Sequence, residues 1–314
     1  MHAAVLVDGR LEVLERPTPE PGPGDVLVAV VGAGVNAADL LQRRGVYPAP
    51  AGWPVDVPGL ELAGVVAAVG PNVEANLVGR RVCAIVGGGA QATHCVVPHE
   101  HLIVVPDTVD LTVAGGFAEA FVTAHDALVT QAAVTATDRV LISGAAGGVG
   151  CAAVQIAAGL GAHVIAVTRT PEFHDALREL GAAQTVTVQE VAALAPVDVV
   201  IELVGAAHLQ HALGVLSPRA RVVVIGVGGG GRVEVDLLTI MNRRATITGS
   251  TLRARSRDEK SLVIRRAAAD LVDDWAARRL RVPVARVVDL ADIASAYDFF
   301  AEPGKFGKVL VRTS

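Results

Sequence analysis

The residues best suited to do chemistry form a glycine-rich loop, Ala145–Gly150, with the sequence AAGGVG. It matches the pattern G-x-G-x-x-G, with alanine in the first glycine position. An expected strand, Asp138–Ser143, precedes it, and an expected helix, Gly148–Gly161, opens from it. Glycines at such a junction let a pyrophosphate approach the helix N-terminus more closely than a Cβ atom would allow. A mere tight strand–helix turn is the alternative, but this setting favours dinucleotide binding. We expect the contacts to come from Ala146, Gly147, Gly148 and Val149.

The end of the next expected strand, His163–Arg169, bears on which dinucleotide is bound. NAD-binding folds of this kind place Asp or Glu there to hold the ribose hydroxyls. This chain has Thr168, Arg169 and Thr170 instead. Because a carboxylate would repel a 2′-phosphate, whereas a hydroxyl and a guanidinium can receive one, we expect NADPH, with NADH less favoured. The alternative, that Arg169 is a solvated surface residue, stays open.

The domain that must hold this loop runs from the expected strand at Asp138 onward. Continuous Val- and Ile-rich strands alternate there with helical stretches, which predicts a parallel sheet covered on both faces. The fold class is therefore α/β, with a doubly wound Rossmann domain of about six strands. The remaining expected strands are 185–188, 197–205, 221–231 and 245–250.

The first third of the chain has a different texture, because short β-rich stretches are broken by Pro and Gly. It predicts an irregular, mostly-β domain. After Ser250 the chain carries a long expected helix, Ser256–Leu280, and then returns to strand at Val284–Leu290 and Lys308–Thr313. We expect a mostly-β domain whose N-terminal part is 1–118, an inserted Rossmann domain, 119–251, and a C-terminal return, 252–314, that completes the first domain.

Composition limits the class of protein. The 314 residues carry a net charge of −5, which gives no reason to expect a nucleic-acid or acidic-membrane partner. Every apolar run is interrupted well before the ~18 residues of a membrane span, and the N-terminus lacks the pattern of a signal peptide. Three widely spaced cysteines do not suggest a disulfide framework. We expect a soluble, cytoplasmic protein.

Several stretches, taken together and in order, resemble the zinc-independent quinone oxidoreductases of the medium-chain dehydrogenase/reductase superfamily. GGGAQAT and GSTLRARS are particularly similar to the p53-inducible quinone oxidoreductase subgroup. The resemblance implies a GroES-like catalytic domain around an NADPH-binding Rossmann domain, in a homodimer. The stretches are 35–52, 58–70, 87–98, the glycine loop and 249–256.

The resemblance also bears on metal binding, because the superfamily has zinc-dependent members. Alcohol dehydrogenases place Cys where this chain has Asn36 and His where it has Leu60. An amide and an isobutyl group cannot replace a thiolate and an imidazole as zinc ligands. The four-cysteine structural zinc loop is also absent. Two pairs of histidines lie close together in the sequence, His99 with His101 and His208 with His211. Neither pair has a third ligand nearby, so we interpret these histidines as solvated, and we place the first pair in an exposed strand. We predict no metal.

Without zinc, a donor must stabilise the negative charge that hydride transfer puts on the acceptor oxygen. By the resemblance, Tyr47 in GVYP is the candidate donor and Asn36 faces the nicotinamide end; Tyr47 can equally anchor the loop that follows it. Two positions depart from the family pattern. Leu41 stands where many relatives have a second Tyr, and Val188 where they often have a Tyr near the 2′-phosphate.

The same matching assigns further residues to the cofactor. Thr123 is placed near the nicotinamide ribose or diphosphate, and Gly226 and Val227 at the carboxyl edge of the fifth strand. The other residues matched in this way are Leu252 and Arg253 at the domain junction and Lys308 near the cleft.

Three acidic residues and one cysteine carry open assignments. We expect Asp39 and Glu61 to pair with Arg43, Arg44 or a backbone amide rather than to transfer protons, and leave Glu119 open to a structural or a catalytic role. Cys151 follows the glycine loop at a helix N-terminus, which can lower a thiol pKa, although a small packed residue is the more ordinary interpretation.

These observations predict an NADPH-dependent reductase, free of zinc, that transfers hydride to a quinone or a small α,β-unsaturated carbonyl in an inter-domain cleft. An enoyl-thioester reductase, which reduces C=C with a Tyr as proton donor, is the nearest alternative. An NADPH-binding protein with little turnover is an alternative of another class.

Overall fold

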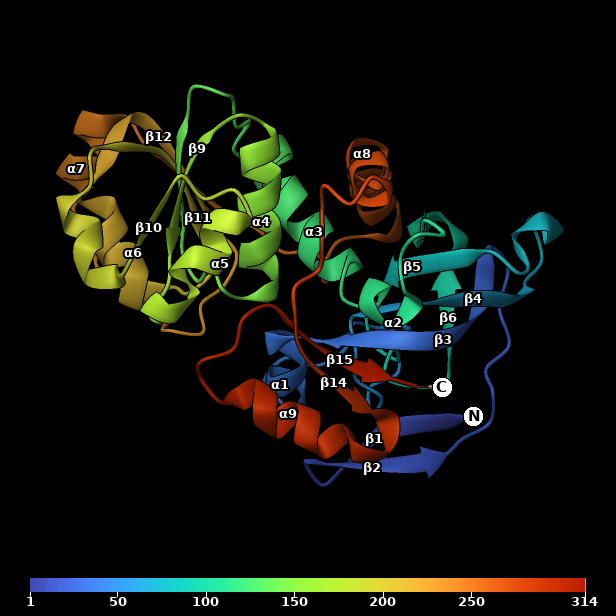
Figure 1. Ribbon diagram of the computed structural model, residues 1–314. Coiled ribbons are helices and arrows are strands. Elements are labelled where there is room, and N and C mark those ends of the chain that lie inside the picture. The colour runs from blue at the N-terminus through green and yellow to red at the C-terminus, as the bar shows by residue number, and fades with distance from the viewer. Residues whose placement is uncertain (314) are drawn as a thin grey trace. The chain divides into compact units, whose positions relative to one another are not determined.

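The computed structural model describes residues 1–313, which divide into two compact units (Figure 1). Unit 1 comprises Met1–Val122 and the chain from Leu252 onward, and unit 2 comprises Thr123–Thr251. The first division falls within the helix Ala118–His125. The predicted α/β class, with a GroES-like unit and a doubly wound parallel unit, is confirmed.

Unit 1 is built on a seven-stranded sheet with the order β14-β15-β3-β4-β5-β7, in which β6 also pairs with β3. The C-terminal strand β15 lies antiparallel to β3, with Val309 opposite Val35, so the end of the chain completes the sheet that its beginning starts. This register brings Lys308 next to the residues that follow β3. β1 (His2–Val7) and β2 (Arg10–Glu15) form a separate two-stranded sheet. The strands of the seven-stranded sheet are β3 (Asp25–Val35), β4 (Glu61–Val69), β5 (Arg81–Ile85), β6 (His94–Pro98), β7 (Leu102–Val104), β14 (Val284–Asp289) and β15 (Lys308–Arg312).

Helices of unit 1 cover this sheet and carry several of the site residues. The long helix expected at 256–280 is α8, whose N-cap Ser256 accepts a hydrogen bond from the amide of Glu259 at 3.2 Å. Phe117 stacks on Trp275 of α8 with ring centroids 3.8 Å apart, which fixes α8 to the segment before α3. The helices are α1 (Ala37–Arg43), η1 (Ala75–Leu77), η2 (His99–His101), α2 (Leu111–Ala114), α3 (Ala118–His125), α8 (Arg257–Ala276), η6 (Leu290–Asp292) and α9 (Ile293–Ala301).

Unit 2 is a six-stranded parallel sheet with the order β10-β9-β8-β11-β12-β13. Numbered within the unit this is 3-2-1-4-5-6, the Rossmann order. Figure 1 shows α4 on one side of the sheet and α6 and α7 on the other. The strands are β8 (Arg139–Ile142), β9 (His163–Val167), β10 (Gln184–Val186), β11 (Val197–Glu202), β12 (Leu216–Val224) and β13 (Thr246–Gly249). The helices are η3 (Asp126–Gln131), α4 (Gly148–Gly159), η4 (Pro171–Phe173), α5 (His174–Glu179), η5 (Val188–Ala193), α6 (Ala206–Leu213) and α7 (Leu237–Arg243).

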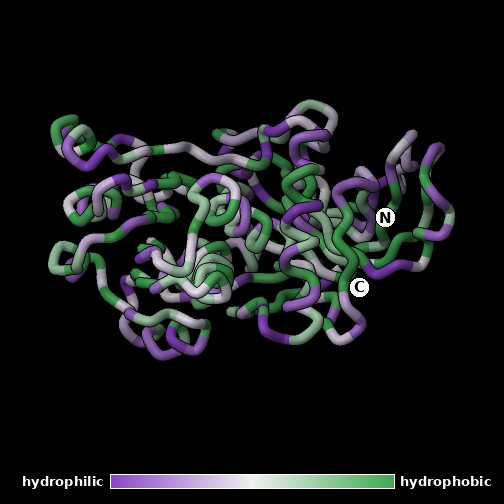
Figure 2. Tube along the Cα trace, turned by 90° about the horizontal axis from the view of Figure 1, so that it is seen from above, coloured by the Kyte–Doolittle hydropathy of each residue, from purple (hydrophilic) through white to green (hydrophobic). Residues whose placement is uncertain are grey.

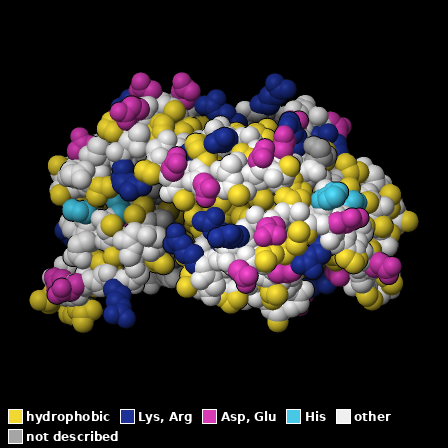
Figure 3. All heavy atoms as spheres, turned by 90° about the horizontal axis from the view of Figure 1, so that it is seen from below, with side chains coloured by type: hydrophobic (Ala, Val, Ile, Leu, Met, Phe, Trp, Pro, Cys, Tyr) yellow, Lys and Arg dark blue, Asp and Glu magenta, His cyan; other side chains and the backbone are white. Residues whose placement is uncertain are grey.

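Each unit buries aliphatic strands, and its hydrophilic segments lie at the periphery (Figure 2). On the face shown in Figure 3, acidic and basic side chains are interspersed rather than gathered by sign. Among residues 1–313, no helix combines the length and the hydrophobicity needed to cross a bilayer.

The expectation of solvated histidines was wrong for two of the four. His99–His101 is a 3₁₀ turn, η2, rather than an exposed strand, and His101 is buried with its Nε2 3.2 Å from the carbonyl of Arg257. His208 is buried on α6 and contacts Glu202. Both corrections have one cause: a histidine can be buried when a neighbouring polar group satisfies one ring nitrogen.

Candidate functional site

The glycine loop of unit 2 lies at the carboxyl end of its central strand β8, where α4 begins. Gly147 is the N-cap of α4, and the first turn of any helix has N–H groups without an acceptor inside the helix. Gly147 is exposed, and its neighbours Ala146, Gly148 and Val149 are half-buried, so the loop is accessible to a ligand. An accessible helix N-terminus of this kind can bind a phosphate group.

Gly150 explains why this loop needs glycine. A Cβ atom at this position would lie 2.4 Å from the carbonyl oxygen of Gly144 and 2.6 Å from the Cα of Ala145. Only a residue without a side chain therefore lets α4 begin so close to the end of β8.

The segment after β9 has the character expected for a 2′-phosphate site. Thr168 is buried, and its hydroxyl accepts a hydrogen bond from the amide of Thr170 at 3.2 Å. Arg169 is exposed and makes no hydrogen bond or ion pair with residues 1–313. The carboxyl end of β9 thus presents an uncommitted guanidinium beside a hydroxyl and no carboxylate.

Thr123 and the end of β12 provide two further groups of unit 2 that could face a cofactor. The Thr123 hydroxyl is buried and has no hydrogen-bond partner within the described chain, which is costly unless a ligand supplies one. Gly226 follows β12, and a Cβ there would lie 2.4 Å from the carbonyl of Leu203, while Val227 is exposed. The backbone packing at this edge therefore also depends on glycine.

Glu202 shapes the same edge of the sheet, and sequence reasoning missed it. Its buried carboxylate accepts hydrogen bonds from the Ser143 hydroxyl at 2.7 Å, from the Gly205 amide at 2.8 Å and from His208 Nδ1 at 2.6 Å. Burial raises the pKa of Glu202, but the bonds from His208 and the backbone outweigh burial, so its pKa is lowered overall. Glu202 thereby ties β8, β11 and α6 together where a dinucleotide would lie.

Unit 1 contains a buried polar cluster of three residues, Asn36, Glu61 and Lys308, which we call the Glu61 cluster. Lys308 forms an ion pair with Glu61 and donates to the Asn36 side-chain oxygen at 2.7 Å. The Asn36 amide nitrogen donates to Glu61 at 3.0 Å, and the other Glu61 oxygen accepts from the backbone amide of Glu119 at 2.9 Å. Gly34 makes room for the cluster, because a Cβ there would lie 2.2 Å from the Glu61 carboxylate.

The hydrogen-bond inventory of the Glu61 cluster distinguishes the roles of its members. Lys308 has three N–H donors, which are directed at Glu61, at Asn36 and, at 3.4 Å, at the carbonyl of Val35. These contacts make Lys308 a positioning residue. The contact between Lys308 and the cofactor that the family resemblance implies stays a prediction. The Asn36 amide uses only one of its two N–H groups, so the second can reach a ligand.

Two further carboxyl groups of unit 1 hold their protons near neutral pH. Burial raises the pKa of Asp39 to about 7, although its carboxylate accepts from the amides of Asn36 at 2.8 Å and Gly59 at 3.2 Å. Burial, and then the charge of Glu61, raise the pKa of Glu119 to about 7. The carboxyl of Glu119 makes no hydrogen bond with residues 1–313, which leaves it able to hold or give up a proton.

Tyr47 is held by its ring and its backbone while its hydroxyl remains available. The guanidinium of Arg253 lies 4.8 Å from the Tyr47 ring centroid and donates to the Tyr47 carbonyl at 3.0 Å. Arg253 also bonds the Gly87 carbonyl at 2.8 Å and Gln42 of α1 at 2.6 Å. The Tyr47 hydroxyl has no hydrogen-bond partner within residues 1–313. Arg253 thus anchors the loop of Tyr47, and no hydrogen bond joins the side chains of Tyr47 and Asn36.

Two family models match this chain. Residues 22–133 match the alcohol dehydrogenase GroES-like domain, and residues 148–269 match the zinc-binding dehydrogenase family. Human quinone oxidoreductase is 31% identical over 252 residues, which cover 77% of this chain and 75% of that protein. The chain belongs to the quinone oxidoreductase-like family.

Two further relatives refine this assignment within the medium-chain dehydrogenase/reductase superfamily. The solved quinone oxidoreductase from Thermus thermophilus, whose complex with NADPH is also known, is 31% identical with a TM-score of 0.86, and the match covers all of both chains. A 2-haloacrylate reductase from Burkholderia sp is 36% identical over 223 residues, 67% of each chain. This member of the quinone oxidoreductase-like family is accordingly an enzyme of the quinone oxidoreductase type.

The two positions that hold zinc ligands in alcohol dehydrogenases carry side chains in this chain that are not zinc ligands. Asn36 is hydrogen-bonded inside the Glu61 cluster, and Leu60 is a buried apolar residue. Within the described residues, no three side chains of His, Cys, Asp or Glu come together as a ligand set. Cys83, Cys95 and Cys151 are all buried, and burial raises the pKa of the Cys95 thiol to about 12.

The sequence signals found some of these residues and missed others. The glycine pattern located the loop of unit 2, and the resemblance located Asn36, Tyr47 and Lys308. Nothing in the spacing indicated that Lys308 would pair with Glu61, 247 positions away. That pairing depends on β15 joining β3, which only the tertiary structure shows.

Proposed function

We propose that this enzyme is an NADPH-dependent reductase, free of zinc, that transfers hydride to a quinone or a small α,β-unsaturated carbonyl compound. The observation that carries the proposal is the Glu61 cluster, in which the Asn36 amide, at a position where alcohol dehydrogenases have a zinc-binding Cys, is hydrogen-bonded to Glu61 and Lys308. The likeness to a quinone oxidoreductase whose complex with NADPH is known supports it.

Several groups in unit 2 fit the cofactor. The glycine loop suits a pyrophosphate, the unpartnered hydroxyl of Thr123 suits a polar ligand atom, and Thr168 with Arg169 suits a 2′-phosphate. Bound NADPH supplies the hydride from its nicotinamide ring.

Unit 1 supplies the groups that stabilise the reduced acceptor. Hydride addition to a conjugated carbonyl leaves negative charge on its oxygen, which needs a hydrogen-bond donor. The unpartnered Tyr47 hydroxyl and the second N–H of the Asn36 amide can both donate. Lys308 keeps Asn36 oriented, and the final proton comes from solvent.

A second candidate function is C=C reduction, because the Burkholderia relative is a 2-haloacrylate reductase. This reaction needs a proton on carbon after the hydride has been added. Tyr47 carries a hydroxyl hydrogen that no described residue uses, and Glu119, with its pKa near 7, holds an exchangeable proton.

The deciding experiment is NADPH oxidation, with NADH alongside, against 1,2- and 1,4-quinones, α,β-enones, 2-chloroacrylate and a crotonyl thioester. Quinone turnover that prefers NADPH and falls about 10- to 100-fold in Tyr47→Phe supports the proposal. Turnover of only the enones, chloroacrylate or thioester moves the enzyme to C=C reduction. Tight NADPH binding without any turnover contradicts both functions and leaves a cofactor-binding protein.

Cofactor recognition is tested separately by binding. Arg169→Ala should weaken the binding of NADPH about tenfold or more, because the guanidinium that contacts the 2′-phosphate is removed. The affinity for NADH, which has no 2′-phosphate, should stay almost unchanged. Arg178→Ala, which removes an exposed arginine of α5 paired with Asp175, is the control. Thr123→Val should weaken both cofactors, whereas Thr185→Val, at another buried unpartnered hydroxyl, should weaken neither. Equal loss of NADPH and NADH in Arg169→Ala would contradict the assignment of the 2′-phosphate.

We also propose that the enzyme is a homodimer. β13 is an edge of the six-stranded sheet, so its outer backbone groups can continue the sheet in a second copy. Leu237, Leu238 and Met241 on α7 and Ile247 on β13 expose apolar surface in the same part of the chain.

A further inference from the structure

Unit 1 contains a cavity of about 630 Å³ outside the Glu61 cluster. One wall is apolar and is formed by Trp53, Pro54, Val57 and Cys95. Trp53 lies against Gly87, where a Cβ would come within 2.5 Å of the indole ring, so the backbone of Gly87 supports this wall. A cavity of this volume can hold a small organic molecule.

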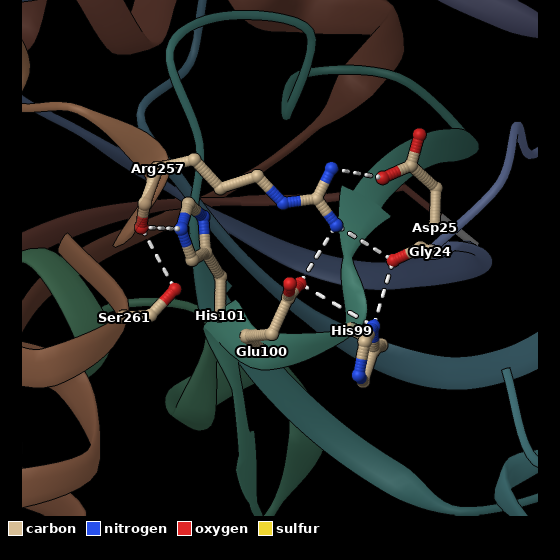
Figure 4. A network of polar contacts seen from close by, with 7 residues as sticks. All are labelled: Gly24, Asp25, His99, Glu100, His101, Arg257 and Ser261. Carbon is tan, nitrogen blue, oxygen red and sulfur yellow. Dashed lines mark hydrogen bonds and ion pairs between the residues drawn. The ribbon is translucent and has the colours of Figure 1, made fainter. Parts of the chain in front are cut away.

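Four cationic side chains, Arg253, Arg255, Arg257 and Lys260, form the basic wall of the cavity, which Glu20 and Asp25 also line. All three arginines have partners. Arg253 bonds Gly87, Tyr47 and Gln42, and Arg255 lies 3.4 Å from Glu259. Figure 4 shows the guanidinium of Arg257 between Asp25 and Glu100, at 3.1 and 2.7 Å, with a further bond to the carbonyl of Gly24.

Lys260 differs from these arginines. Its residue is only 3% exposed, and its ammonium makes no hydrogen bond or ion pair with any residue from 1 to 313. Burial lowers its pKa, the charge of Glu119 raises it, and the charges of Arg253 and Arg255 lower it further. A buried and unpaired ammonium is costly to the folded state, so its presence at a cavity wall calls for a ligand.

His101 supplies a second unpartnered atom to the same wall. Its Nε2 lies 3.2 Å from the carbonyl of Arg257, as Figure 4 shows, but its buried Nδ1 has no partner within the described chain. The N-terminus of α8 begins beside both residues, because Ser256 and Arg257 also line the cavity. The positive end of a helix of twenty residues favours an anion there.

We infer that this cavity binds an organic anion whose oxyanion group contacts Lys260 and whose apolar body lies against Trp53; because His101 Nε2 donates to the Arg257 carbonyl, its Nδ1 is an acceptor for a hydrogen-bond donor of the same molecule. The inference does not depend on the proposed reductase activity, because none of the residues that carry it belongs to the Glu61 cluster or to the glycine loop. Arg253 is the one residue that this wall shares with the anchoring of Tyr47.

The test is a calorimetric titration with two matched probes, 1-anilinonaphthalene-8-sulfonate and its uncharged analogue N-phenyl-1-naphthylamine. The full-length protein is used with saturating NADP⁺, so that the sulfonate cannot occupy the glycine loop. Lys260→Met should weaken the sulfonate about tenfold or more and leave the uncharged analogue unchanged. Arg265→Met, which removes an exposed cation of the same helix, is the control and should change neither.

A thermal melt of each variant completes the design. Without ligand, Lys260→Met should melt no lower than the wild type, since it removes a buried unpaired charge. If it fails to fold, Lys260→Gln replaces it. Equal sulfonate affinity in wild type and Lys260→Met would overturn the inference, as would equally tight binding of the uncharged analogue by the wild type. Failure of NADP⁺ to bind would count against the proposed function alone.

Discussion

Removing the charge of Lys308 should destabilise unit 1 strongly, and removing the charge of Glu61 as well should restore most of the loss. The Glu61 carboxylate is fully buried, and Lys308 is the cation that pairs with it. In Lys308→Met the carboxylate would keep only the donors from Asn36 and from the backbone of Glu119. A buried charge would then lack its counter-ion.

The expected magnitude follows from this burial. Breaking a buried ion pair at one partner costs about 3–5 kcal/mol, because the other charge is left uncompensated. The same range applies to Glu61→Gln, which leaves the Lys308 ammonium buried with only oxygen acceptors. The two losses together would come to about 6–10 kcal/mol if they were additive. The double variant has no charge left in the Glu61 cluster and should lose only about 2 kcal/mol, for imperfect packing and an altered hydrogen bond.

Tryptophan fluorescence in urea is a suitable assay, because both tryptophans, Trp53 and Trp275, lie in unit 1 and report on its unfolding. The four proteins of the cycle give the coupling free energy directly. A double variant as unstable as the sum of the two single variants would refute the reasoning, since the pair would then contribute no charge compensation. Arg312→Met on the same strand, paired with Asp289 in an exposed ion pair, should change the free energy of unfolding by less than about 1 kcal/mol.

Three further predictions concern other parts of the chain. Gly150→Ala should destabilise unit 2 by about 1–3 kcal/mol, because its Cβ would lie 2.4 Å from a backbone oxygen. Gly159→Ala in the same helix has no neighbour within 4 Å and should stabilise unit 2 by up to about 1 kcal/mol. Thermal melts followed by circular dichroism measure both changes. Asp39 keeps its proton to about pH 7 when folded but loses it near pH 4 when unfolded, so this contribution, of order 4 kcal/mol, is present below pH 4 and lost as pH rises through 7. The urea midpoint should therefore decrease as the pH is raised from 4 to 7, and Asp39→Asn should flatten this dependence; an equal slope in the variant would contradict it. Met241→Asp, at a 67% exposed residue of α7, should halve the mass measured by light scattering, and a dimeric mass in the variant would count against that interface.

The sequence predicted the order of elements in unit 2 because each of them is defined locally. Val- and Ile-rich stretches gave the strands, and the glycines of the loop marked the junction of β8 and α4. Parallel strands need crossover helices, so local periodicity was enough to predict the doubly wound fold. The boundaries were less accurate, since the strand expected at 221–231 is β12, which begins at Leu216 and ends at Val224.

The candidate site in unit 1 could be predicted only in part, because its contacts are long-range. The resemblance indicated Tyr47 and Asn36, but it did not show that Arg253 holds the Tyr47 loop from 206 positions away. Similarly, His208 gives no local sign of burial, since its partner Glu202 belongs to the preceding strand and its side chain could equally have faced solvent. Pattern and propensity describe neighbours in the sequence, whereas these contacts depend on which strands and helices meet.

The same reasoning explains why the buried charges of unit 1 should be interpreted differently from one another. Lys308 has acceptors for all of its N–H groups, so its burial is accounted for by the folded chain alone. Lys260 is equally buried, and its ammonium has no acceptor among the described residues. Its burial therefore lowers the stability of the folded chain, and no hydrogen bond offsets this loss. Because apolar side chains of similar length, such as Met, would fill the position of Lys260 at lower cost, the lysine is better explained by a bound anion than by the stability of the fold.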